Sequence, residues 1–329
     1  MRFDGFVGHA VPKARVSAFA DRGQFPHALL IEGSRGSGRR TLARLIARAA
    51  VCSSNTERPC GVCLACRKAT AGSHPDITEY GGDGSARSFH LDTLLGIRED
   101  AYVLPNEAPR RVFLLADAQN MTERAQNALL KVLEEPPAHV LFLLTCESRA
   151  QLLSTIQSRT VTLSLGPVTA EDALPLLQQE LPEQTPEELT RALSLFGGSI
   201  GQTLEGLRDG EYQQVLSHLS EMIHALTAPD ELPLLKLTAS LSRDKARLEA
   251  LLSALKLIFR DALAGRSGDK SHLSPLPDDA AELATRFTAA QLMRLIAVTE
   301  ELQTARLRNM NMSLLLTRMC ALLREAIGR

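Results

Sequence analysis

Residues 33–41 carry the glycine spacing of a phosphate-binding loop. The segment Gly33-Ser-Arg-Gly-Ser-Gly-Arg-Arg-Thr41 lies between an apolar run and a helix-forming stretch. In such loops two glycines let backbone N–H groups wrap phosphates, a following lysine bridges them, and the next Ser or Thr holds magnesium. Gly33 and Gly38 fit this pattern, but Arg39 stands at the lysine position and Arg40 at the hydroxyl position. The sequence thus predicts the loop's backbone without its two reactive side chains.

A shifted reading of the motif does not repair the loop. If Thr41 held magnesium, the glycine positions would fall on Ser34 and Arg39, neither of which is glycine. A glycine-rich turn with no nucleotide-binding history is the alternative for this loop taken alone. We expect weak or absent ATP binding at the five positions of the degenerate loop, Gly33, Gly38, Arg39, Arg40 and Thr41.

A matching loss lies at the end of a later apolar run. In nucleotide hydrolases a buried strand ends in Asp-Glu, where Asp organises magnesium and Glu polarises the attacking water. The run 111–116 ends in Asp117-Ala118, so the chain has no evident general base there. Two degraded halves in the right order favour a former nucleotide site over a simple turn.

Four cysteines form a second candidate site. Cys52, Cys60, Cys63 and Cys66 follow the pattern C-x7-C-x2-C-x2-C. Four soft thiolates with no open position suit a structural zinc ion, to which we assign no reaction chemistry. The alternative, a set of reduced surface thiols, would be exposed to oxidation. His74 could compete as a ligand, but a turn role is favoured for it.

Secondary-structure elements must position these residues. Up to about residue 165, the sequence alternates between short apolar runs and helical patterns, which is typical of a parallel α/β domain. The expected strands are 27–32, 76–80, 111–116 and 140–145. One expected helix follows the glycine-rich loop to about residue 51, and the others cover about 91–101, 122–135 and 149–157.

Strand signals stop after Gly166-Pro167, and only helical patterns follow. Thr169 and Thr185 begin capping-box-like segments, and an apolar stripe from Leu248 to Ala262 predicts a buried helix face. We expect three domains. Residues 1–166 form an α/β domain that contains the cysteine module at 52–66, residues 167–210 form a small helical domain, and residues 211–329 form a helical C-terminal domain.

Composition excludes several classes of protein. In 329 residues, 37 Lys and Arg face 38 Asp and Glu, so no global basic excess indicates nucleic-acid binding. No stretch approaches the roughly 18 apolar residues of a membrane span, and the first residues lack the apolar core of a signal peptide. Six cysteines are too few for a secreted disulfide scaffold. We expect a cytoplasmic protein with no membrane partner.

Taken together, these residues resemble the bacterial DNA polymerase III clamp-loader subunits, of the AAA+ class, over essentially the whole chain. The resemblance implies an α/β P-loop AAA+ module with a parallel sheet, then an all-α lid domain and an all-α C-terminal collar that mediates oligomerisation. Besides the loop and the cysteines, the matching motifs are Phe6-Val-Gly-His9, Phe25-Pro-His-Ala28, Gly72-Ser-His-Pro-Asp76, Asn127-Ala-Leu-Leu-Lys-Val-Leu-Glu-Glu-Pro-Pro137 and Ser158-Arg159-Thr160.

Within this family the chain resembles an ATPase-inactive stator subunit. The ATP-hydrolysing subunits gamma and tau carry Lys-Thr, Asp-Glu and a lid arginine at the positions of Arg39-Arg40, Asp117-Ala118 and Gly201. The resemblance implies a hetero-oligomer, a pentamer with delta and gamma or tau, that loads the sliding clamp onto primed DNA within the polymerase III holoenzyme.

Arg159 is the surviving part of the active site. The resemblance implies that it acts as an arginine finger in trans, on nucleotide bound by the neighbouring subunit. Thr160 replaces the family's cysteine, which leaves this role untouched. Read without the family, an arginine at a helix end would simply satisfy terminal carbonyls.

Two rival functions stay open at this point. One is a gamma-like, catalytically competent ATPase in which Arg39 replaces lysine and Thr41 reaches magnesium. The other is a nucleic-acid-binding zinc ribbon, for which Arg58, Arg67 and Lys68 are available but no interleaved aromatic residues.

Overall fold

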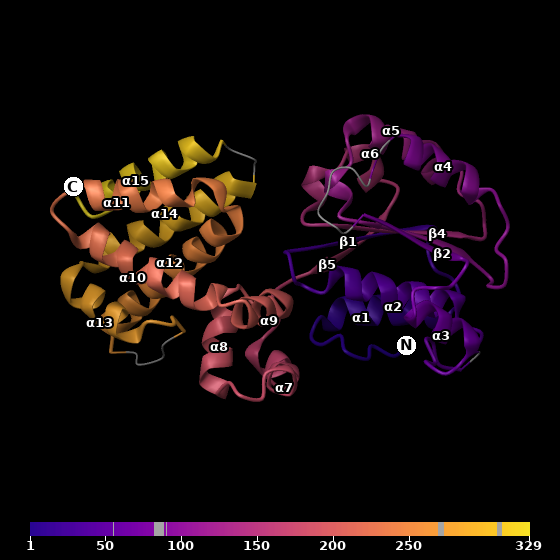
Figure 1. Ribbon diagram of the computed structural model, residues 1–329, viewed down its shortest axis with the longest axis horizontal. Coiled ribbons are helices and arrows are strands. Elements are labelled where there is room, and N and C mark those ends of the chain that lie inside the picture. The colour runs from indigo at the N-terminus through magenta and orange to yellow at the C-terminus, as the bar shows by residue number, and fades with distance from the viewer. Residues whose placement is uncertain (55, 82–88, 90, 269–272, 308–310) are drawn as a thin grey trace. The chain divides into compact units, whose positions relative to one another are not determined.

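The protein forms two compact units, Met1–Val168 and Thr169–Arg329, in a computed structural model (Figure 1). The structure describes all residues except 55, 82–88, 90, 269–272 and 308–310. Among the described residues, no helix combines the length and the apolar character needed to cross a membrane.

The first unit is built on a five-stranded parallel sheet in the order β2-β3-β4-β1-β5. Strands β3 and β4 read as continuous apolar runs because helices cover both faces of the sheet. The strands are β1 (Ala28–Gly33), β2 (Ile77–Gly81), β3 (Arg111–Ala116), β4 (Val140–Cys146) and β5 (Val161–Leu165). The four strands expected from the sequence are present within one residue at each end.

Strand β5 is the strand that the sequence analysis missed, and the helices at 10–21 and 64–70 were not expected either. Its five residues alternate in character and are only partly buried, since β5 lies at the sheet edge and pairs with β1 alone. It therefore lacks the continuous apolar run that marked the other strands.

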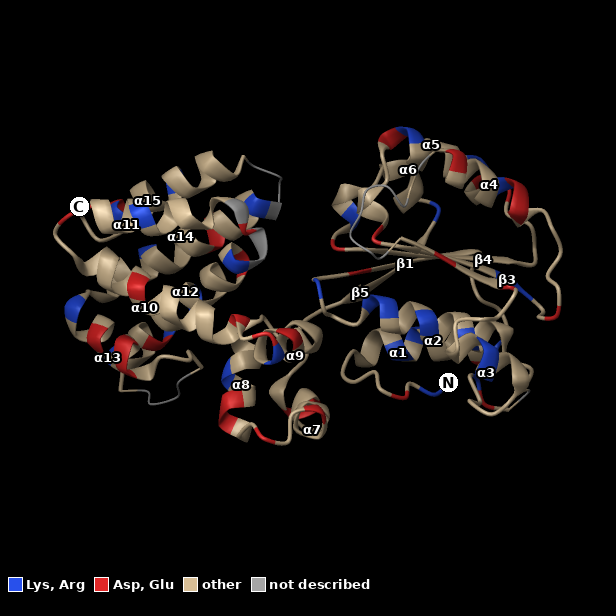
Figure 2. Cartoon of the chain, in the orientation of Figure 1, with Lys and Arg blue, Asp and Glu red and all other residues tan. Residues whose placement is uncertain are grey.

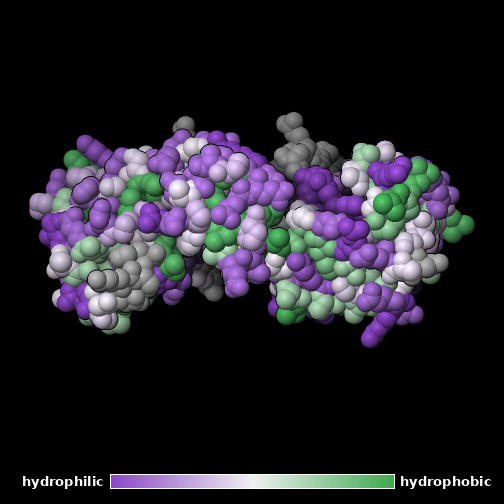
Figure 3. Space-filling view, turned by 90° about the horizontal axis from the view of Figure 1, so that it is seen from below, coloured by the Kyte–Doolittle hydropathy of each residue, from purple (hydrophilic) through white to green (hydrophobic). Residues whose placement is uncertain are grey.

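Helices cover the two faces of this sheet (Figure 1). One face carries α1 (Ala10–Asp21), α2 (Arg39–Val51) and α3 (Leu64–Thr70), and the other carries α4 (Leu91–Ala101), α5 (Glu123–Glu134) and α6 (Ser154–Gln157). Two apolar clusters fill the layers, one on each side of the sheet. The face of α1 to α3 mixes hydrophilic and hydrophobic surface (Figure 3).

The helix expected over 149–157 is wrong as a single element. It consists of a 3-10 turn, η3 (Arg149–Gln151), and the one-turn helix α6. Leu152 and Leu153 between them are extended, and the N–H of Leu153 donates to the side chain of Gln126 at 2.8 Å instead of continuing a helix.

The sheet brings two loops to one edge. In a parallel sheet the carboxyl ends of the strands lie together, and ligand sites form there. The residues after β1 begin the glycine-rich loop, and those after β3 begin with Asp117 and the 3-10 turn η2 (Ala118–Asn120). Strand β4 lies between them. The strand order thus places the glycine-rich loop and the Asp117-Ala118 motif at the same edge of the sheet.

In the second unit, the described residues form helices and their connections, with no strand among them. Thr169 and Thr185 cap their helices as expected, the latter in a complete capping box. One apolar cluster runs from Ala192 to Ile327 and includes the stripe Leu248 to Ala262. The division of this unit at residue 210 stays a prediction. The helices are α7 (Ala170–Glu180), α8 (Pro186–Leu195), α9 (Ile200–Arg208), α10 (Glu211–Thr227), α11 (Leu232–Ser240), α12 (Lys245–Arg266), α13 (Pro277–Arg286), α14 (Ala289–Leu307) and α15 (Met312–Ala326), with the 3-10 turn η4 (Leu241–Arg243).

Asp76, just before β2, fixes the loop that precedes β3. Its fully buried carboxylate accepts backbone N–H bonds from Asn106 at 2.6 Å and from Glu107 and Ala108 at 2.9 Å. Burial opposes ionisation, but these donors outweigh it and hold the pKa of Asp76 below its usual value. The carboxylate thus stabilises the folded state through its charged form.

We expect Asp76→Asn to lower the free energy of unfolding by about 1–3 kcal/mol at pH 7, because one amide oxygen cannot replace two carboxylate oxygens. A depressed folded pKa gives stability that is fully present above the unfolded pKa, about 3.9, and is lost as the pH falls through the folded pKa. The gap between wild type and variant in urea unfolding should therefore shrink below about pH 4. Equal urea midpoints at pH 7 would contradict this role.

Candidate functional site

The phosphate-type loop keeps its glycines for reasons of packing. Gly38 has φ +88°, and a Cβ there would lie 2.8 Å from the ring of Phe6. A Cβ on Gly33 would lie 2.6 Å from Ser37 Oγ and 2.8 Å from the carbonyl oxygen of Leu165. Both glycines are therefore required by the protein's own contacts, whether or not a phosphate binds.

Arg39 turns back into the loop that it follows. Its Nη1 donates to the carbonyl oxygen of Gly33 at 2.8 Å, and its Nη2 lies 3.3 Å from Asp117 Oδ1. The arginine is 9% exposed. The carboxylate that would organise magnesium thus neutralises the cation at the lysine position, and both groups are committed to each other.

The remaining loop residues point elsewhere. Arg40 Nε donates to Glu79 Oε1 on β2 at 2.5 Å, and Thr41 is exposed in the first turn of α2. Ala118 is fully buried and has no carboxylate. The structure therefore brings Gly33, Gly38 and Arg39 together but does not join Arg40 or Thr41 to them.

Arg159 closes α6. Its Nη1 donates to the carbonyl oxygen of Thr155 at 3.0 Å and to Ser158 Oγ at 3.2 Å, and its Nη2 lies 2.7 Å from Glu134 Oε1 on α5. One third of the side chain remains exposed. The helix-capping contacts that sequence reasoning offered as an alternative are thus present in the isolated chain, while the guanidinium remains partly accessible.

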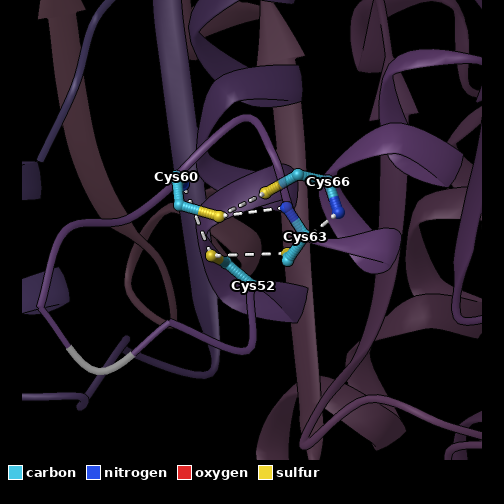
Figure 4. Close-up of side chains that lie close together, drawn as sticks. All are labelled: Cys52, Cys60, Cys63 and Cys66. Carbon is cyan, nitrogen blue, oxygen red and sulfur yellow. Dashed lines mark hydrogen bonds between the residues drawn. The ribbon is translucent and has the colours of Figure 1, made fainter.

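The cysteines converge as their spacing predicts (Figure 4). All four Sγ atoms lie within 4.8 Å of one another, and the pairs Cys52–Cys63 and Cys60–Cys66 are 4.0 Å apart. Four sulfurs about 2.3 Å from a zinc ion would be about 3.8 Å apart, so the set fits a tetrahedral ion with little adjustment. The cluster can hold a metal ion.

Backbone donors favour the thiolate form in this cluster. The N–H groups of Cys60, Cys63 and Cys66 each donate to a cysteine sulfur at 3.4 Å. At Cys63, burial opposes ionisation, but N–H donors from Cys66 and Ser53 outweigh it and lower the pKa to about 6. Burial raises the pKa of Cys66 to about 12. A metal ion would have to displace that proton.

His74 lies apart from the cysteines. It is buried, and its Nδ1 accepts the backbone N–H of Asp76 at 3.1 Å. It belongs to none of the metal-ligand groups found among the described residues, where the cysteines stand alone. The turn role favoured from the sequence agrees with this geometry.

Sequence reasoning missed the partners of the loop arginines. Glu79 accepts from Arg40 and also from Arg44, at 3.0 and 3.1 Å. The spacing of Arg40, Arg44 and Arg48 at four-residue steps is the signal that places all three on one face of α2.

Comparison with known proteins gives consistent matches. Residues 11–169 match the family model described as DNA polymerase III, delta subunit. DNA polymerase III subunit delta′ of Haemophilus influenzae is 29% identical over 86% of this chain and 85% of its own length, and that of Escherichia coli is 28% identical over 90% and 87%. Subunit tau of Escherichia coli is 31% identical over 70% of this chain but only 36% of its own length. A solved DNA polymerase III gamma subunit-related protein from Thermotoga maritima is 19% identical over 94% of this chain and 99% of its own, with a TM-score of 0.43.

The parallel sheet, the degenerate loop at its carboxyl edge and the helical second unit define a protein of the AAA+ class. The chain is similar over most of its length to bacterial DNA polymerase III clamp-loader subunits, in agreement with the resemblance in the sequence. Three relatives that match over most of their own length are named subunit delta′, in Bacillus subtilis, Haemophilus influenzae and Escherichia coli.

Proposed function

We propose that this chain is the non-hydrolysing stator subunit of the bacterial DNA polymerase III clamp loader. It assembles with the delta and gamma or tau subunits into a hetero-oligomer, a pentamer by family resemblance, which loads the sliding clamp onto primed DNA in the cytoplasm. The observation that supports this most directly is the position of Arg39, which occupies the interior of its own loop and pairs with Asp117.

Nucleotide binding would require this pair to separate. A triphosphate in the loop would bring its negative charge beside Asp117 and would compete with that carboxylate for Arg39. Breaking a largely buried ion pair leaves an uncompensated charge, which costs several kcal/mol. Arg40 cannot hold magnesium as a hydroxyl does, and Ala118 offers no general base. The Arg39–Asp117 pair thus opposes nucleotide binding, Arg40 removes a magnesium ligand, and Ala118 removes the general base for turnover.

Arg159 supplies the active contribution in this proposal. The end of α6 holds its guanidinium one third exposed, with Glu134 as its ion-pair partner. A neighbouring subunit's nucleotide would compete with Glu134 for the same guanidinium. Arginine suits this role because its planar fork stabilises charge that develops on a transferring phosphoryl group.

The cysteine cluster holds a structural zinc ion in this proposal. Four thiolates leave no open coordination position, so the ion would contribute folding energy and no catalytic step. Cys52 is the residue after α2, and Cys66 lies within α3. The ion would thus join α3 and the turns around Pro59 to the helix that follows the degenerate loop.

The purified chain tests the loss of hydrolysis. We expect no ATP turnover above background, no saturable binding of a fluorescent ATP analogue, and co-elution of the chain with delta and gamma as one assembly. The double variant Arg39→Lys, Arg40→Thr should bind the analogue at least tenfold more tightly, because it frees Asp117 and restores both loop side chains. It should still not turn over ATP, since Ala118 is unchanged.

Arg22→Gln, an exposed substitution after α1, is the control and should behave as wild type. Brisk ATP hydrolysis by the wild-type chain alone, dependent on Thr41, would instead support a gamma-like ATPase. Failure to co-elute with the other subunits would refute the stator assignment itself.

A further inference from the structure

A cavity beside the second half of α2 has no part in the proposed function. Its volume is about 440 Å³, which lies in the range of small-molecule sites. The walls come from α2, the end of α3 and β2, and Ile77 and Leu114 contribute apolar surface. The first lining residue on α2 is Arg44, so the lining does not include the residues of the degenerate loop.

Two hydrogen-bond donors that line this cavity have no partner. Arg48 Nε and His74 Nε2 are both buried without a hydrogen bond among the described residues. His74 is 3% exposed, and the acid nearest to Nε2, Glu107, lies 3.6 Å away, beyond hydrogen-bonding distance. A buried donor left unpaired costs about 1–3 kcal/mol, so two beside one cavity indicate a missing acceptor.

The protonation of His74 is fixed by its surroundings. Because Nδ1 accepts the N–H of Asp76, the ring proton lies on Nε2, the buried nitrogen that has no hydrogen-bond partner among the described residues. Burial lowers the pKa of His74 against the opposing influence of Asp76 and Glu107, so the ring is neutral at neutral pH. His74 and Arg48, which both line the cavity, thus each carry an N–H donor that no described residue satisfies.

The charge of the cavity is positive. Arg40, Arg44 and Arg48 follow one another at four-residue steps along α2, whose ribbon carries blue, basic positions in Figure 2. Glu79 is the carboxylate that lines the cavity among the described residues, and Arg40 and Arg44 already share it. On α3, Lys68 is paired with Glu107 at 2.7 Å. Arg48 is therefore the guanidinium left to meet an incoming anion.

We propose that this cavity binds the phosphoryl group of a small metabolite of mononucleotide size. Arg48 and His74 donate hydrogen bonds to the phosphate oxygens, since guanidinium groups match phosphate geometry and charge. Ala47, Ile77 and Leu114 contact the body of the ligand. His74 lies too deep for a phosphodiester within a nucleic-acid backbone to reach it, which favours a small molecule.

Calorimetric titration of the full chain at low ionic strength tests this site, with inorganic phosphate, pyrophosphate and mononucleotides as probes. We expect saturable binding of at least one probe, together with a higher melting temperature. Arg48→Gln should weaken binding by tenfold or more. Arg67→Gln, an exposed arginine on α3 that does not line the cavity, should bind as wild type does.

The melting temperature without ligand separates binding from a structural role. Because Arg48 Nε has no partner, Arg48→Gln should leave that temperature unchanged or raise it, whereas a structural arginine would lower it. Absence of saturable binding, equal affinity of wild type and Arg48→Gln, or tighter binding of single-stranded oligonucleotide than of any mononucleotide would each overturn the proposal. The proposal would also be overturned if the Arg39→Lys, Arg40→Thr double variant changed binding of the probe and Arg48→Gln did not. None of these outcomes depends on co-elution with delta and gamma, so this site and the stator role fail separately.

Discussion

Replacing Arg159 with alanine should slow ATP hydrolysis about a thousandfold at the subunit interface that this chain faces. The reason is that a guanidinium supplied in trans stabilises charge on the transferring phosphoryl group. Single-turnover hydrolysis by the loader reconstituted with delta, gamma, clamp and primed DNA measures the effect. Sites at other interfaces will continue to turn over, so only part of the total burst is expected to disappear.

Two further variants separate the finger from the helix cap. Arg159→Lys keeps the charge but loses the planar fork, and it should recover little of the rate. Glu134→Gln removes the ion-pair partner at 2.7 Å, so it should leave hydrolysis unchanged or raise it slightly. If Arg159 only caps α6, Arg159→Ala will lower the melting temperature of the isolated chain and leave the burst intact. That result would remove the arginine finger from the proposed function.

Removal of the metal should produce the largest loss of structure. Structural zinc in small modules contributes an apparent binding free energy of about 10–16 kcal/mol at pH 7, and the turns around Pro59 and Gly61 have little apolar core of their own. We expect one zinc ion per chain by elemental analysis, and rapid proteolysis within residues 52–70 after chelation. Because the ion requires thiolates, affinity for it should fall as the pH falls.

Cysteine variants identify the ligands. Cys60→Ser should lower zinc occupancy at least tenfold and expose the same protease sites, whereas Cys320→Ala, in the second unit, should retain the ion. A chain that carries no zinc when purified, or that resists protease equally with and without chelator, would refute the structural ion.

Those elements of the fold could be predicted whose own amino-acid composition reflects their burial. The runs at 111–116 and 140–145 are buried on both faces, so their composition alone marks them as strands. The edge strand Val161–Leu165 could not be found in this way, because two polar residues interrupt its five-residue apolar pattern. The break at Leu152 and Leu153 depends on a hydrogen bond to Gln126, which lies on another helix.

The features of the candidate site also separate into those that local sequence predicts and those that depend on the tertiary structure. Cysteine spacing predicts convergence because the ligands are at most fourteen positions apart and turns connect them. The pairing of Arg39 with Asp117 spans 78 positions and depends on the strand order, so the sequence showed two losses but not their mutual neutralisation. The unpaired donors of Arg48 and His74 are defined by what surrounds them, which no local pattern encodes.

The contact between Phe6 and Gly38 matters for the interpretation of other genomes. Since the aromatic ring occupies the space of a side chain at that position, packing alone can require the glycine in a chain that binds no nucleotide. If the proposed loss of hydrolysis is correct, assignment of ATPases by glycine pattern alone would count such subunits as enzymes. Scoring the Arg39 and Ala118 positions instead would distinguish the two kinds of subunit.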